Sequence, residues 1–188
     1  MALPLLNDDR MRLVLALVMS LAHAGWPALP ADAEPVPTPL IKAVYLFNFA
    51  RFTEWPATGT QGPLTLCVLG DADVASSLDG LIGDRPINGR NVSVASLATF
   101  RIVRTCHLLY VAGDDSTRTA GALDAVTSLH VFTVGDGEPF VRAGGIAALV
   151  IEDGKTKFAI NPDALNRSGL RVSSKMLGLA RLIREESR

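Results

Sequence analysis

The chain has 188 residues, of which 48% are hydrophobic and 20% charged, and its formal net charge is −1. This apolar content excludes an intrinsically disordered chain, and the composition is unlike that of a collagen or a coiled coil. Because 18 basic residues stand against 19 acidic ones, there is no bulk electrostatic basis for binding nucleic acid, and composition alone predicts a near-neutral globular domain.

The first residues of the chain predict export. Arg10 and Arg12 precede an apolar run at 13–21, which ends in the small-x-small sequence of residues 22–24. This order of features is typical of a secretory signal peptide. The run is too short to cross a bilayer core about 30 Å thick, which takes about 20 helical residues. We therefore expect residues 1–24 to be a cleaved signal peptide, with a short amphipathic or buried helix as the alternative.

A proline-rich leader, residues 25–38, follows and has little capacity to pack. Thr38 and Pro39 suit the cap and first position of the helix that we expect over 40–52. Its side chains form two mainly apolar stripes, one of Ile41, Tyr45, Asn48, Phe49 and Phe52 and the other of Leu40, Val44 and Phe47. A helix that is apolar on two sides is buried on two sides, either within the domain or against a second subunit.

Strands and helices alternate in the next part of the chain. Short apolar runs predict inner strands over 64–69, 92–95, 108–111 and 131–134. Amphipathic stretches predict a helix that Asp73 caps and Gly83 ends, and a second helix over 116–127. This alternation predicts an α/β fold with an open, mostly parallel sheet and right-handed crossovers.

The pattern changes near the C-terminus. Two strands, 147–152 and 155–160, flank Asp153-Gly154, which is a strong signal for a two-residue hairpin. Asn161 and Gly169 should cap and end the helix that follows, and 170–172 is extended. Ser173 should cap a last helix whose inward residues are Met176, Leu179, Ala180 and Ile183. With no internal repeat or linker, residues 39–188 are predicted to form one domain.

The predicted export bears on the state of the two cysteines, Cys67 and Cys106. An oxidising compartment favours a disulfide between them, which stabilises the fold by about 4 kcal/mol in the chain-entropy model. Two independent buried thiols are the alternative, because spacing alone does not prove contact. Neither thiol has a second cysteine within ligand spacing, so a zinc site is disfavoured.

The sequence offers few groups for catalysis. It has no G-x-S-x-G nucleophile elbow, and His107 and His130 each stand alone at the head of a predicted strand, where we expect a structural histidine. Asp71 and Asp73 have ordinary turn and cap duties. We therefore expect a protein that is not an enzyme and that needs no metal or cofactor, and a hydrolase is the less favoured alternative.

Two aromatic and basic segments carry a ligand hypothesis. The first helix ends in Arg51 and Trp55, and the extended piece near the C-terminus contains Arg171 and Ser173 on one side, with Lys175 nearby. If these segments meet, the two arginines would rim an apolar pocket for a small aromatic or carboxylate-bearing ligand. The alternative is two separate solvated arginines whose stems cover core surface.

Four ordered segments resemble the YfiR family of periplasmic regulators. They are KAVYLFNFARFTEWP at 42–56, LCVLGD at 66–71, KFAIN at 157–161 and GLRVSSKML at 169–177. The resemblance extends from about residue 40 to residue 184, and four segments in matching order are far more specific than any single motif in the chain.

The resemblance implies a Rossmann-like α/β domain that is a homodimer and catalyses nothing. Such proteins repress an inner-membrane diguanylate cyclase by binding its periplasmic sensor part, and so modulate cyclic-di-GMP signalling and biofilm formation. An outer-membrane, peptidoglycan-binding lipoprotein titrates the repressor away. Cys67 and Cys106 match the family's bridge positions, whereas the second cysteine pair of some relatives has no counterpart here.

A second hypothesis belongs to a different class of protein. The exported domain could be a periplasmic sensor module that binds a small molecule at the rim of Arg51 and Arg171. The two hypotheses are compatible if a ligand biases the repressor.

Overall fold

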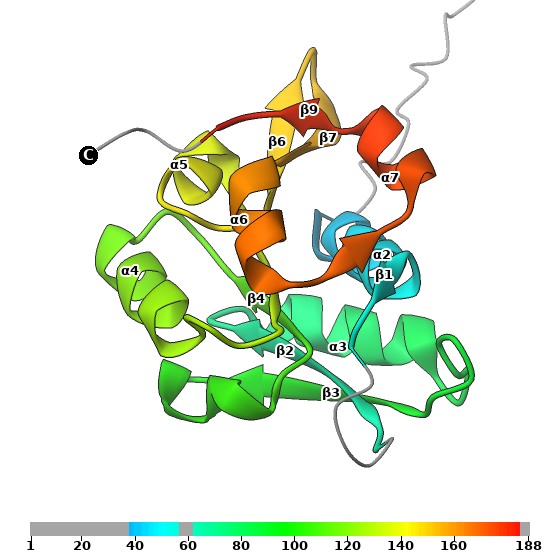
Figure 1. Ribbon diagram of the computed structural model, residues 1–188. Coiled ribbons are helices and arrows are strands. Elements are labelled where there is room, and N and C mark those ends of the chain that lie inside the picture. Colours follow the sequence, from blue (N-terminus) through cyan, green and yellow to red (C-terminus); the bar gives the residue numbers. More distant parts are fainter. Residues whose placement is uncertain (1–37, 57–61, 185–188) are drawn as a thin grey trace, which may run out of the picture. The chain divides into compact units, whose positions relative to one another are not determined.

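The computed structural model describes residues 38–56 and 62–184 (Figure 1). The predicted signal peptide and all but the last residue of the predicted leader lie outside the described residues. In the described part of the chain, no helix is long and apolar enough to cross a membrane.

A seven-stranded sheet has the strand order β3-β2-β4-β5-β6-β7-β9. Its strands are β2 (Leu64–Leu69), β3 (Val92–Leu97), β4 (Leu108–Val111), β5 (Phe132–Asp136), β6 (Ala147–Glu152), β7 (Lys155–Ile160) and β9 (Arg181–Leu182). The strands from β3 to β6 pair in parallel, whereas β7 runs antiparallel to β6 and parallel to β9. The mostly parallel α/β fold and its hairpin are therefore confirmed.

Helices cover both faces of this sheet (Figure 1). One apolar cluster packs α2 (Thr38–Arg51) and α3 (Ala72–Ile82) on one face, together with α6 (Pro162–Ser168) and α7 (Ser174–Leu179). A second cluster packs α4 (Ser116–Ala125), α5 (Gly137–Arg142) and the 3-10 helix η2 (Phe100–Thr105) on the other. Two short strands, β1 (Thr53–Glu54) and β8 (Arg171–Val172), pair with each other outside the main sheet.

The first helix buries only part of the two stripes that its large residues predicted, since Phe49 is buried and Tyr45 and Phe47 pack against the core. Its buried residues are Ala43, Leu46, Phe49 and Ala50. Leu40, Val44 and Phe52 remain 40%, 41% and 38% exposed. Of the two alternatives, burial of both stripes within the domain is therefore not observed, and burial against a second subunit stays a prediction. The two alanines let the helix approach its neighbours closely, and an analysis of large side chains alone overlooks such a face.

Most of the predicted helix caps are present, with two corrections. Thr38, predicted to cap α2, is its first helical residue. Asn161 accepts from the backbone N–H groups of Asp163 and Ala164, and Gly169 ends α6 at φ 69°. The cap of α3 is Asp71 and not Asp73, because the Asp71 side chain accepts from the backbone N–H of Val74. An aspartate in the first turn suits the helix dipole as well, so the sequence permits both positions.

The last helix is shorter than predicted. It ends at Leu179, which is 78% exposed, and Ala180 is extended. Ile183 is buried, but it lies after β9 and donates its backbone N–H to the carbonyl of Ile160. Gly178 weakens the helix, and the free edge of β7 offers backbone hydrogen bonds that the chain takes instead.

Cys67 and Cys106 form a disulfide, with their Cα atoms 5.8 Å apart. Cys67 lies in β2, and Cys106 lies two residues before β4, the neighbouring strand. Both sulfurs lie in the apolar cluster on the α4 side of the sheet. The bridge therefore closes a long loop and ties β2 to the entry of its neighbour β4.

Replacing both cysteines by alanine should lower the free energy of unfolding by about 4 kcal/mol, because the unfolded chain regains the freedom of a loop of about 40 residues. For a domain of this size, the melting temperature should fall by about 10 °C. Calorimetry of the double variant measures the change, and the reduced natural protein should match it. Equal melting temperatures, or free thiols in protein purified from the periplasm, would contradict the prediction.

Candidate functional site

The structure brings together the two segments that carry the predicted ligand rim. β1 and β8 pair antiparallel, with Thr53 opposite Val172 and Glu54 opposite Arg171. The backbone N–H of Ser173 also donates to the carbonyl oxygen of Phe52 at 3.0 Å. The end of α2 and the start of α7 are therefore joined by backbone hydrogen bonds.

The five predicted rim residues differ in their roles. Arg51, Arg171 and Lys175 are exposed. Ser173 caps α7, because its Oγ accepts from the backbone N–H of Met176 at 3.3 Å. Trp55 is a packing residue, whose indole N–H donates to the carbonyl oxygen of His107 at 3.0 Å. The three exposed cations remain a predicted contact surface, whereas the other two side chains already have structural partners.

His107 is the structural histidine that the sequence predicts. Its Nδ1 accepts from the backbone N–H of Thr65 at 3.1 Å, and its Nε2 lies 3.0 Å from the Arg90 guanidinium. Trp55 packs edge-on against its ring. Burial lowers the pKa of His107, and the charge of Arg90 lowers it further. The folded state therefore favours the neutral form of the His107 ring.

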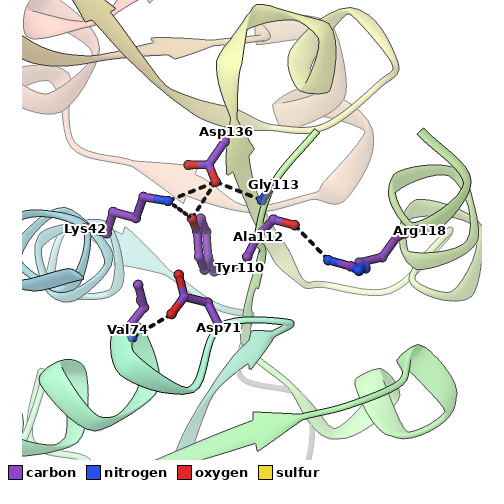
Figure 2. Close-up of polar contacts among 8 residues, drawn as sticks. All are labelled: Lys42, Asp71, Val74, Tyr110, Ala112, Gly113, Arg118 and Asp136. Atoms are coloured by element: carbon purple, nitrogen blue, oxygen red, sulfur yellow. Dashed lines mark hydrogen bonds and ion pairs between the residues drawn. The ribbon is translucent and has the colours of Figure 1, made fainter. Parts of the chain in front are cut away.

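A polar cluster that the sequence analysis missed lies where the parallel strands end (Figure 2). Asp136 Oδ2 accepts from Lys42 Nζ at 3.0 Å, from the Tyr110 hydroxyl at 2.7 Å and from the Gly113 backbone N–H at 2.9 Å. Lys42 Nζ is also 2.8 Å from the Tyr110 oxygen. Burial raises the pKa of Tyr110, and the Asp136 carboxylate raises it further, so the phenol stays protonated and donates.

The neighbouring strand end adds a second cation and a second carboxylate (Figure 2). Arg118 Nη1 donates to the carbonyl oxygen of Ala112 at 3.1 Å. Its guanidinium lies so close to Gly70 that a Cβ there would be 2.8 Å from Nη1, and Gly70 also has φ +88°. Asp71 caps α3 beside this contact. Only glycine combines this backbone conformation with room for the arginine.

The position of this cluster is the one where open α/β sheets bind ligands. The chain enters the sheet at β2 and then places β3 on one side and β4 on the other. Ligands bind beyond the carboxyl ends of the strands at such a reversal of strand order. The polar groups come from the ends of β2, β4 and β5, and from α2 and α4.

The sequence contained a partial signal for this cluster. Asp71, Asp114 and Asp136 each stand at or just after the end of a predicted inner strand, and the carboxyl ends of parallel strands share one edge. Nothing in the sequence indicates that Lys42 belongs to this cluster, because it lies 94 residues from Asp136. It also lies in a helix for which only the apolar stripes were analysed. Among the described residues, no three His, Cys, Asp or Glu side chains are placed to hold a metal ion.

The strand order of the sheet and the polar cluster at the strand ends together define the class of the domain. It is an open, mostly parallel α/β domain with the strand order of ligand-binding folds. The sequence matches the YfiR/HmsC-like family over residues 40–181, and the chain belongs to that family. This confirms the resemblance seen in the four motifs. The family consists of periplasmic regulators of diguanylate cyclase signalling rather than enzymes.

Solved structures share this fold at low sequence identity. A conserved domain protein from Vibrio cholerae matches with a TM-score of 0.53 and 15% identity, over 77% of this chain and 60% of that one. The ligand-free, open structure of CD0873, a substrate binding protein with adhesive properties from Clostridium difficile, matches with a TM-score of 0.50 and 14% identity, over 77% and 59%. This chain therefore spans about three fifths of either protein, and both show the fold alone.

Acidification should destabilise the protein through His107. The folded-state pKa lies below the ordinary value of 6.5, so the unfolded chain takes up the proton first as the pH falls. The free energy of unfolding should therefore decrease from pH 6.5 down to the lowered pKa and then level off. Denaturant titrations at a series of pH values measure this slope.

His107→Asn supplies the matched variant, because its amide oxygen can accept from Thr65 N–H and does not titrate. This variant should lose the His107 part of the slope, whereas His130→Gln should keep it. An unchanged slope in His107→Asn would assign the acid sensitivity to other groups.

Proposed function

We propose that this protein represses an inner-membrane diguanylate cyclase by binding the cyclase's periplasmic sensor part, and so modulates cyclic-di-GMP signalling and biofilm formation. It acts as a homodimer after export by an N-terminal signal peptide. An outer-membrane, peptidoglycan-binding lipoprotein relieves the repression by binding the repressor. Membership of the YfiR/HmsC-like family supports the regulatory class, and the exposed face of α2 supports a protein partner.

This face, which we call the α2 surface, comprises Leu40, Val44, Phe47, Arg51 and Phe52. Three of its large apolar side chains are about 40% exposed, although the helix has an ample buried face elsewhere. Phe47 is half-buried under the Arg85 guanidinium, 5.7 Å from the ring centroid. A contiguous apolar patch with a basic rim is typical of a protein-binding surface.

Repression requires that the protein prefer one state of the cyclase. A regulator that binds the active and inactive states equally shifts nothing, however tightly it binds. We therefore expect the α2 surface to fit the inactive arrangement of the sensor part. The lipoprotein then acts by mass action, because it lowers the concentration of free repressor.

Val44→Asp should abolish co-purification with the cyclase's periplasmic part and raise cellular cyclic-di-GMP to the level of a deletion strain. A charge in the centre of an apolar contact is left without water or a partner. The fold should persist, since Val44 is exposed in the free chain. Ile151→Asp is the matched control, because Ile151 is 71% exposed on β6, outside the α2 surface, and it should bind and repress normally.

Light scattering of the same variant separates the two possible contacts. If Val44→Asp is a monomer and still binds the cyclase, the α2 surface is the dimer contact and its assignment to the cyclase is wrong. If deletion of the gene leaves cyclic-di-GMP unchanged and no complex forms, the proposed function itself is wrong.

The pairing of β1 with β8 favours a second candidate, a periplasmic sensor module for a small ligand. It places Arg171 in the segment joined to the end of α2, which carries Arg51. Lys175 lies one residue into α7, close in sequence to this pair. Three exposed cations, of which Arg51 lies over the Phe52 ring, suit an aromatic carboxylate.

A thermal-shift screen of aromatic carboxylates tests this candidate. A ligand at a hundred times its dissociation constant adds about 2.7 kcal/mol to the free energy of unfolding. Arg171→Ala should reduce the shift, whereas Arg104→Ala, which removes an exposed arginine on η2, should not. A flat screen would count against a ligand at this rim.

A further inference from the structure

A cavity of about 1390 Å³ lies between α4 on one side and α5 and α6 on the other. Its apolar lining includes Leu123, Val126, Val131, Phe140, Ile146 and Ala164. Gly113, Asp114, Ser116, Asp136 and Gly137 line it at the carboxyl ends of β4 and β5. Polar side chains, among them Thr119, Asp124 and Ser168, also occur along the lining. A cavity that combines an apolar wall with convergent polar groups can hold a small molecule.

The charge at that end is negative. The carboxylates that line this end are those of Asp114 and Asp136, and Lys42 pairs with Asp136. Arg118 pairs with Asp115, which is not among the lining residues. Two negative groups against one positive group leave a formal excess of one negative charge. Elsewhere the lining contains two carboxylates and two arginines, Asp124, Asp163, Arg142 and Arg167, so their formal charges sum to zero. Arg142 forms an ion pair with Glu138, and Asp163 forms one with Arg184. The end at the strand termini therefore favours a cation over an anion.

Asp136 is built to hold an ammonium group. It already binds the ammonium of Lys42, and Figure 2 shows that all three of its hydrogen bonds end on one oxygen. The Gly113 N–H and the Tyr110 hydroxyl fix the orientation of the carboxylate. The second oxygen accepts no hydrogen bond from the described residues, so a further donor can reach it in a fixed direction.

We propose that this cavity binds a small amphipathic amine, with the apolar body between α4 and α5 and the ammonium group at Asp136 and Asp114. This site is separate from the α2 surface and from the rim of Arg51 and Arg171, and it does not depend on the proposed repression. A neutral or anionic molecule of the same shape lacks the charge-assisted hydrogen bond that Asp136 offers.

Three probes with the same apolar body test the ligand class: 4-phenylbutylamine, 4-phenylbutanol and 4-phenylbutyrate. Calorimetric titration into the full, disulfide-bonded protein should show the amine binding at least about tenfold tighter than the alcohol, a difference of about 1.4 kcal/mol. The acid should bind more weakly than the alcohol. Equal affinity for the amine and the acid, or no binding by the amine, would overturn the proposal.

Substitutions locate the site. Asp136→Asn should weaken binding of the amine by about tenfold, and Asp114→Asn by about threefold, because each removes one charge from the proposed ammonium site. Asp153→Asn is the matched control. It removes the same charge from the exposed hairpin turn, where φ 52° also suits asparagine. It should leave the affinity unchanged.

Asp136→Asn also weakens the bonds to Lys42 and Tyr110, so its folding is checked by melting temperature. Leu123→Trp provides an independent variant, because it fills the cavity from a half-buried wall position and leaves every carboxylate in place. It should abolish binding of the amine. If the amine binds Leu123→Trp and Asp114→Asn as well as the natural protein, or shifts amide resonances only around Arg51 and Arg171, the cavity is not the site.

Discussion

The position of β2 between β3 and β4 is the constraint on which the rest of the structure depends. It pairs with β3 on one side and β4 on the other, and both of its faces are buried, Leu66 and Val68 under α2 and α3, and Leu69 in the opposite cluster. An inner strand of a parallel sheet cannot form until its neighbours arrive. The Cys67–Cys106 bridge limits how far the second neighbour can stray. The same placement creates the reversal of strand order where the polar cluster lies.

One carboxylate touches both regions for which a binding role is proposed. Asp136 lines the cavity between α4, α5 and α6, and its Oδ2 accepts from Lys42. Lys42 lies in α2 between Leu40 and Val44, two of the exposed residues of the α2 surface. The proposed ligand site and the proposed partner surface therefore share the Lys42–Asp136 contact.

The sequence predicted those elements whose local chemistry agrees with the global fold. The β6–β7 hairpin, with Asp153-Gly154 at its turn, lies where expected, and Asn161 and Gly169 bound α6. The six-residue helix α5 gave no periodic signal, because it contains Gly137 and Pro139. It forms because Phe140 packs where a Cβ on Gly135 or Gly145 would overlap its ring. The Lys42–Asp136 pair joins residues 94 positions apart, and no local pattern encodes such a contact.

The composition of α2 supports the proposed partner more strongly than exposure alone. The helix buries two alanines beside Leu46 and Phe49 and directs Leu40 and Val44 toward solvent. Interchanging the large exposed and the small buried residues would bury more apolar area, since each buried methylene contributes about 0.8 kcal/mol. The observed order leaves that area for the protein contact proposed above. The disulfide, which constrains the unfolded chain, lies in the apolar cluster on the α4 side of the sheet. The bridge and the proposed contact surface therefore lie on opposite faces of the sheet.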